Sequence, residues 1–176
     1  MTKRFANEKR IVEVNSHKVY LGLGSNLGDC RKNLERAIRL ISDRVGQVTR
    51  QSSFIETEPW GFESEHQFMN AVILCETTKT PREVLLLTQQ IERDMGRTQK
   101  SWAVGNWPLA VSSDPKAKSQ RLKAKYADRP IDIDILLYDD LTVDEPDLMI
   151  PHPLMYDRDF VMIPLNEIRN IEILTP

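Results

Sequence analysis

Two aspartates, Asp132 and Asp134, stand two positions apart in an otherwise apolar stretch that runs from Ile131 to Leu137. Side chains alternate between the two faces of a β-strand, so both carboxylates are expected on one face, with Cα atoms about 6.5–7 Å apart. Two like charges at this distance repel each other, and a divalent cation that prefers oxygen ligands would relieve the repulsion. The stretch therefore predicts either a metal site or a solvent-exposed sheet face that tolerates two acids.

Three further features surround this pair. Arg129 precedes Asp132 by three residues, where its cation could meet the same phosphates that a metal bridges. His152 lies between two prolines, at a distance along the chain that allows a return to the same end of a sheet. The glycine-rich stretch over 22–29 has Leu27 where a dinucleotide fingerprint needs glycine, and it lacks the Gly-Lys-Ser/Thr ending of a phosphate loop. We interpret it as a tight turn with a supporting role near a ligand.

The elements that position these residues alternate along the chain. Apolar and β-branched runs predict strands, and apolar residues at helical spacing predict helices. Over 80–96, Thr80 and Glu83 form a capping box and Gly96 ends the helix. The predicted order is strand 18–26, helix 29–46, strands 47–57 and 68–78, helix 80–96 and strand 129–140. This βαββαβ order is typical of a ferredoxin-like α+β sandwich, an antiparallel sheet with helices packed on one face and the other face left for a ligand.

Length and composition restrict the class of protein. The chain has 176 residues, 40% of them hydrophobic and 28% charged, which favours a single globular domain. A formal net charge of −2 argues against a polyanion as the main partner, so nucleic acid is not expected. Cys30 and Cys75 lie far apart without metal-ligand spacing, which fits a cytoplasmic protein. No apolar run has the length of a signal-peptide core or a membrane span, so we expect no membrane partner, and we expect a monomer.

Six motifs in a fixed order carry a resemblance that spacing alone does not establish. They cover the chain from about Val19 to Ile168, and they read LGLGSNLGD, FIETEPWG, FMNAV, IERDMGR, RPIDIDILLYDD and IPHPLM followed by RDFVMIPL. In this order they resemble the 6-hydroxymethyl-7,8-dihydropterin pyrophosphokinase family of folate biosynthesis. That family has a ferredoxin-like fold and transfers the β,γ-diphosphate of ATP to the pterin hydroxymethyl oxygen, releasing AMP.

The resemblance implies roles for the charged residues. Asp132 and Asp134 would hold two Mg²⁺ ions between themselves and ATP, and two such cations can clamp the attacking and bridging oxygens. Arg97 and Arg129 match the mobile-loop arginines of the family, which hold phosphate oxygens and stabilise charge as the diphosphate moves. No covalent intermediate is needed.

The resemblance also assigns the two substrate pockets. Phe68 and Phe160 match aromatic side chains that stack on the pterin ring, although core packing is the ordinary role of such phenylalanines. Asn70 matches the residue whose amide orients the pterin, because it offers both a donor and an acceptor. The full pterin set comprises Thr57, Trp60, Phe68, Asn70 and Phe160. The positions that match ATP contacts are Glu92, Ile135, His152 and Arg158.

One departure and two alternatives accompany the resemblance. The segment over about 101–125 is longer than in compact family members, and we expect it to act as a lid over the active site. The chain is expected to form one domain over 1–176, with an N-terminal extension over about 1–17. The alternatives are a single-stranded nucleic-acid binding module, in which bases stack on the two phenylalanines, and a metal-dependent phosphohydrolase. Magnesium-dependent nucleotide binding would argue against the first, and a requirement for pterin would argue against the second.

Overall fold

The computed structural model of the chain describes residues 16–59, 64–97 and 128–170. Trp60, most of the predicted N-terminal extension and the predicted lid over 101–125 lie outside these residues. Within the described parts, none of the helices combines the length and the apolar character needed to cross a membrane.

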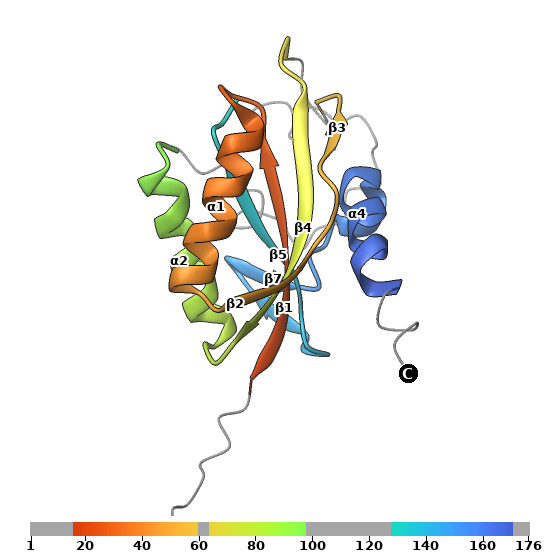
Figure 1. Cartoon of the computed structure of the whole chain (residues 1–176). Coiled ribbons are helices and arrows are strands. Elements are labelled where there is room, and N and C mark those ends of the chain that lie inside the picture. The colour runs from red at the N-terminus through yellow and green to blue at the C-terminus, as the bar shows by residue number, and fades with distance from the viewer. Residues whose placement is uncertain (1–15, 60–63, 98–127, 171–176) are drawn as a thin grey trace, which may run out of the picture.

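Strand β1 (His17–Ser25) lies at the centre of an antiparallel sheet. It pairs on one side with β4 (Phe68–Thr77) and on the other with β5 (Asp132–Tyr138). Strands β2 (Gln47–Gln51) and β3 (Ile55–Thr57) both pair with the outer side of β4. The order is therefore β2-β4-β1-β5, with β3 further along the same side of β4, and β5 forms the opposite edge (Figure 1).

Helices α1 (Cys30–Arg44) and α2 (Pro81–Asp94) lie side by side on one face of this sheet (Figure 1). The predicted capping box is present, because the Glu83 backbone N–H donates to Thr80 Oγ1 and the Thr80 backbone N–H donates to Glu83 Oε2 at 2.8 Å. Asp29 caps α1 by accepting a hydrogen bond from the Lys32 backbone N–H at 3.1 Å. The predicted βαββαβ order is confirmed, with the predicted strand over 47–57 present as two strands, β2 and β3.

The main core fills the space between the two helices and the sheet. Alternate strand residues point into it, as the period of two along a strand requires. They are Val19, Leu21, Leu23, Ala71, Ile73, Cys75, Ile131, Ile133 and Ile135. The residues between them point to the other face of the sheet.

A third helix covers part of that other face. After β5 the chain forms a hairpin of β6 (Val143–Glu145) and β7 (Leu148–Ile150), a 3₁₀ turn η1 (Met155–Asp157) and helix α4 (Asp159–Asn170). Figure 1 shows α4 on the side of the sheet opposite α1 and α2. It contributes to a second apolar cluster, which contains Tyr20, Val72, Leu74, Leu136, Met155, Val161, Leu165 and Ile168. The sequence predicted helices on one face only, so α4 is an addition, and only part of the second face is left for a ligand.

The predicted strand over 47–57 is divided into β2 and β3. Ser52 lies between them, and its side chain takes part in the pairing with β4: the Val72 backbone N–H donates to Ser52 Oγ at 2.9 Å. The Ser52 backbone N–H donates to the Val72 carbonyl, also at 2.9 Å. A hydroxyl that bonds to the neighbouring backbone replaces one regular ladder position, which interrupts the strand without breaking its contact with β4.

Candidate active site

Two glycines of β1 lie on the sheet face that carries Asp132 and Asp134. The Leu136 side chain packs over Gly22, so Gly24 forms the floor of the candidate site. Gly24 pairs with Asp132 of β5 on one side and with Asn70 of β4 on the other, and Gly22 pairs with Asp134. A Cβ on Gly24 would lie 3.1 Å from Asn70 Oδ1. The side chains of β4 and β5 therefore flank a strip of sheet that carries no side chain of its own. This corrects the interpretation of the glycine-rich stretch, because only Gly28, with a φ of 72°, lies in the turn.

Asn70 is buried and oriented by a neighbour on β3. Its Nδ2 donates to Thr57 Oγ1 at 2.8 Å, which directs Oδ1 toward the space above Gly24. Phe68, two residues earlier on β4, points to the same face and is also buried. The predicted pterin residues Thr57, Phe68 and Asn70 thus meet where β3 pairs with β4.

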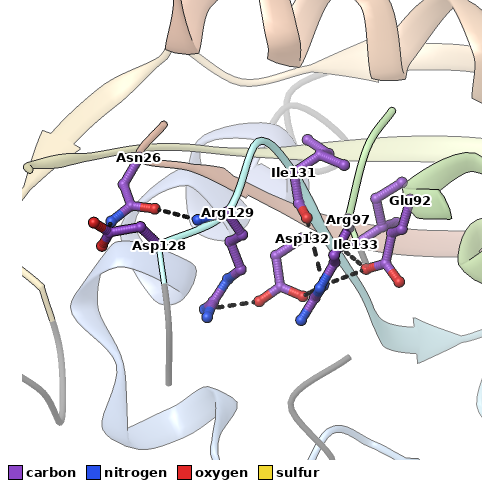
Figure 2. A network of polar contacts seen from close by, with 8 residues as sticks. All are labelled: Asn26, Glu92, Arg97, Asp128, Arg129, Ile131, Asp132 and Ile133. Atoms are coloured by element: carbon purple, nitrogen blue, oxygen red, sulfur yellow. Dashed lines mark hydrogen bonds and ion pairs between the residues drawn. The ribbon is translucent and has the colours of Figure 1, made fainter. Parts of the chain in front are cut away.

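Asp132, Arg97 and Glu92 form a buried ion network at the outer edge of β5 (Figure 2). Arg97 Nη1 contacts Asp132 Oδ1 and lies 2.7 Å from Glu92 Oε1. The same Glu92 oxygen accepts a hydrogen bond from the Ile133 backbone N–H at 2.8 Å. Glu92 and Arg97 are each only 3% exposed at the side chain, so they cover an edge strand whose backbone would otherwise face solvent.

Arg129 contacts both Asp132 and Phe68. Its Nη2 lies 2.9 Å from Asp132 Oδ2, and its guanidinium carbon lies 5.2 Å from the centroid of the Phe68 ring. The cation therefore neutralises Asp132 while it packs against the aromatic side chain. The positive charge expected near the two aspartates is supplied at Asp132 by two arginine side chains.

The protonation state of Arg97 is fixed by this network. Burial alone would lower the pKa of Arg97, but the charges of Asp132 and Glu92 outweigh it and raise the pKa above its ordinary value. Arg97 is therefore a permanent cation, placed beneath the metal-ligand candidate rather than in open solvent.

His152, Arg158 and Phe160 approach the site from the segment after β7. The His152 backbone N–H donates to the Leu136 carbonyl at 2.9 Å, which returns the chain to β5. Burial lowers the pKa of His152, Asp134 opposes this shift and Arg158 adds to it. The Leu154 backbone N–H donates to His152 Nδ1 at 3.3 Å, so the neutral ring carries its proton on Nε2. Arg158 lies with its guanidinium carbon 5.7 Å from the Phe160 ring centroid.

Comparison with known proteins identifies the family. The profile of the 7,8-dihydro-6-hydroxymethylpterin-pyrophosphokinase (HPPK) family matches residues 20–170. A 2-amino-4-hydroxy-6-hydroxymethyldihydropteridine pyrophosphokinase from Porphyromonas gingivalis is 45% identical over 151 residues, which are 85% of this chain and 89% of the relative. The Bacillus subtilis protein of the same name is 36% identical over 150 residues, 85% of this chain and 76% of the relative. The chain belongs to the HPPK family.

Solved structures agree on the fold. A Plasmodium falciparum HPPK-DHPS matches with a TM-score of 0.61 at 14% sequence identity, over 87% of this chain and 41% of that chain. An HPPK-DHPS in complex with substrates matches with a TM-score of 0.61 at 15% identity, over 86% of this chain and 40% of that chain. This chain therefore spans about two fifths of those longer proteins. The predicted ferredoxin-like fold class is confirmed, and so is the predicted function of a folate-synthesis pyrophosphokinase.

The four residues of this HPPK chain that are predicted to contact ATP differ in how accessible they are to a nucleotide. Ile135 is buried in the main core, on the face that packs against the helices, so only its backbone is available to a nucleotide. Glu92 is bonded to Arg97 and to the β5 backbone, and Arg158 is buried. His152 lies nearer the surface, and its Nε2 proton is available for donation. Their roles toward ATP stay predictions.

Two residues of this HPPK site were not identified from the sequence. Asn26 and Asp128 form hydrogen bonds around the backbone of Arg129 (Figure 2). Asn26 belongs to the glycine-rich stretch that was interpreted as a turn, and Asp128 precedes the DxD strand by four residues. The predicted strand over 18–26 included Asn26, and no local signal pointed to its role, because its partner Asp128 lies 102 positions away.

Proposed function

We propose that this HPPK chain transfers the β,γ-diphosphate of ATP to the hydroxymethyl oxygen of 6-hydroxymethyl-7,8-dihydropterin above Gly24. The observation that carries the proposal is the convergence of Asn70 from β4 and Asp132 from β5 on the same glycine strip. One side of the strip offers an oriented amide and an aromatic ring for a flat heterocycle. The other side offers carboxylates for metal-bound phosphates.

The acids fit two Mg²⁺ ions that ATP brings with it. Asp132 and Asp134 project from one face of β5, and carboxylate oxygens are ligands that Mg²⁺ prefers. Among the described residues no group of three or more acidic, histidine or cysteine side chains could hold a metal ion. Two carboxylates without a protein cage suit Mg²⁺, which keeps several waters and takes substrate phosphates as further ligands. Bound there, the ions would neutralise phosphate charge and polarise the β-phosphorus.

The pterin is held by stacking and by one amide. Phe68 and Phe160 supply aromatic faces, which give affinity without fixing the orientation of the ring. Asn70 fixes it, because its Nδ2 is already committed to Thr57 and its Oδ1 faces the strip as an acceptor. The pterin amino group is the natural donor to this oxygen.

The cations act on the phosphates. Arg129 is the one that must change partners, because its guanidinium rests on Asp132 and Phe68. In the reacting complex it would leave Asp132 available to hold a Mg²⁺ ion and would hold phosphate oxygens instead, which stabilises charge on the diphosphate as it moves. Arg97 stays beneath Asp132 and limits the negative charge there. His152 Nε2–H donates a hydrogen bond to a phosphate oxygen.

The reaction itself is the test. The purified protein is incubated with ATP, MgCl₂ and 6-hydroxymethyl-7,8-dihydropterin, and products are separated by anion-exchange chromatography. We expect AMP and the pterin diphosphate in equal amounts, with no AMP when either MgCl₂ or pterin is left out. ADP as the nucleotide product, or AMP formation at the same rate with and without pterin, would overturn the proposal and favour a phosphohydrolase.

The proposal extends to the state of the protein in the cell. We propose a cytoplasmic monomer, consistent with two widely spaced cysteines and a single HPPK domain over most of the chain. Sedimentation at several protein concentrations, with and without an ATP analogue, tests the monomer: a mass that rises with concentration would contradict it.

A further inference from the structure

The end of β1 is fastened to the start of β5 by one buried asparagine. Asn26, 2% exposed, accepts a hydrogen bond from the Arg129 backbone N–H through Oδ1 at 2.8 Å. Its backbone N–H donates to the Arg129 carbonyl at 3.2 Å. Regular pairing between these strands ends at Gly24 and Asp132, so the asparagine continues the contact where the ladder stops. The backbone of Arg129 is thereby held on both its N–H and its carbonyl.

Asp128 joins a third segment to this junction. Its Oδ1 accepts from Asn26 Nδ2 at 2.6 Å and from Ser64 Oγ at 2.7 Å. His66 Nε2 lies 3.9 Å from the other carboxylate oxygen. Ser64 and His66 lead directly into β4 and Phe68, which belongs to the proposed pterin pocket. The Asp128 carboxylate thus connects the segment before β4 with Asn26, next to the backbone of Arg129.

We propose that Asn26 and Asp128 are positioning residues that set the direction of the Arg129 side chain. The proposal rests on the role of Arg129 given under Proposed function. Arg129 has to reach Asp132 and Phe68 in one state and phosphate oxygens in the other, and a long side chain does this from a fixed backbone. Figure 2 shows the contact of Arg129 with Asp132. A backbone held at its N–H and its carbonyl restricts the arc that the guanidinium can sweep. The Asn26 side chain bonds to Asp128 and to the Arg129 backbone, so it acts through Arg129.

The first experiment changes one atom of the junction. Asn26→Asp keeps the oxygen that accepts from Arg129, but it replaces the donor to Asp128 by a carboxylate oxygen, which repels that side chain. We expect kcat to fall by about 10- to 100-fold, because a misplacement of about 1 Å in a positioning group can cost that much. Asn33→Asp is the matched control: Asn33 bonds to Ser25 Oγ and the Leu27 carbonyl in the same turn, without touching 128–129, and should leave kcat near the wild-type value.

A reciprocal swap provides the rescue. In Asn26→Asp/Asp128→Asn, the carboxylate at position 26 accepts from the Arg129 N–H and from the new amide at position 128, and the net charge is unchanged. The swap should restore most of the lost kcat. A swap variant that is folded, by its circular dichroism, and as slow as Asn26→Asp would overturn the proposal.

A double-mutant cycle with Arg129→Ala separates positioning from general support. If Asn26 acts through Arg129, Asn26→Asp lowers kcat in the wild-type background and has no further effect once Arg129 is alanine. Equal loss in both backgrounds would overturn the positioning role. If Arg129→Ala itself keeps wild-type activity, the proposed role of Arg129 fails, and this inference fails with it. That result differs from one in which Arg129 is required for activity but Asn26→Asp lowers kcat equally in both backgrounds.

A second variant keeps the test valid should Asn26→Asp not fold. Asp128 is 33% exposed at its side chain, so Asp128→Ala removes the carboxylate without opening the core. It releases Asn26 Nδ2 and Ser64 Oγ together, and it should lower kcat in the wild-type background while having no effect in Arg129→Ala. An Asp128→Ala enzyme with wild-type kcat would refute the coupling of the two segments through this carboxylate.

Discussion

Removal of the Arg97 side chain is the perturbation with the most direct structural consequence. In Arg97→Ala, Glu92 loses its ion pair with Arg97 and keeps the hydrogen bond from the Ile133 backbone N–H. Asp132 loses one of its two arginines and keeps Arg129. The sequence predicted that Arg97 contacts phosphate, whereas the structure shows that it also neutralises buried carboxylates. The variant should therefore be less stable than the wild type even without substrate.

The expected loss follows from burial. Removing one partner of a buried ion pair costs about 3–5 kcal/mol, because the remaining charge stays away from water without compensation. Glu92 is 3% exposed and keeps a hydrogen bond from the Ile133 backbone N–H, and Asp132 is 17% exposed and still paired with Arg129, so the lower end applies. A loss of about 3 kcal/mol in a domain of this size corresponds to a decrease in Tm of about 6–12 °C.

Thermal unfolding followed by circular dichroism, without ligands, measures this loss. Arg93→Ala is the control on the same helix, because Arg93 is exposed and its side chain donates to Gln90 Oε1 at 2.8 Å, so its Tm should change little. Arg97→Met/Glu92→Gln should recover most of the stability, since both charges are gone and the glutamine oxygen still accepts from Ile133. Millimolar MgCl₂ should raise the Tm of Arg97→Ala more than that of the wild type, because fewer cations compete for Asp132.

Two results would refute this reasoning. A Tm of Arg97→Ala within about 2 °C of the wild type would mean that the ion network contributes less than about 1 kcal/mol. An Arg97→Met/Glu92→Gln variant no more stable than Arg97→Ala would mean that the loss comes from packing rather than from the uncompensated charge.

Gly24→Ala should raise the KM for pterin by about 5- to 30-fold, the effect of weakening one hydrogen bond by 1–2 kcal/mol, because the new Cβ pushes Asn70 Oδ1; an unchanged KM would argue against a pterin above the strip. Asp134→Ala should abolish turnover and leave the circular dichroism spectrum intact; near-normal activity at moderate MgCl₂ would exclude Asp134 as a ligand. Burial raises the pKa of the Cys75 thiol from 9.0 to about 11, so at pH 8 a disulfide reagent should modify Cys30 and spare Cys75. Because this pKa is raised on folding, its contribution to stability is complete below pH 9 and is lost toward pH 11, and the loss should be absent in Cys75→Ala.

Local chemistry made several features predictable. The capping box of Thr80 and Glu83 depends on residues three positions apart, and the common face of Asp132 and Asp134 depends on residues two apart. Interactions this short in sequence are nearly independent of the rest of the fold. The predicted helices α1 and α2 and the strand β5 were therefore found within a few residues of their observed ends.

Helix α4 shows where local patterns were insufficient. Val161, Leu165 and Ile168 repeat at helical spacing, but Pro164 lies among them and the segment was considered only as a motif. Which face of the sheet such a helix covers depends on the hairpin β6–β7 that precedes it. The partial cover of the second face, and hence the size of the site, is a property of the tertiary structure.

The sequence alone determined which residues are predicted to carry the chemistry, because the DxD pair, the amide and the arginines are read from residue type and order. Only the tertiary structure decided what each one does in the folded chain. Gly24 became the floor of a site through its register between β4 and β5, and Arg97 became a buried cation while Arg129 lies on Phe68. Asn26 and Asp128 meet across 102 positions, and such a contact follows from the packing of the strands, which no local pattern encodes.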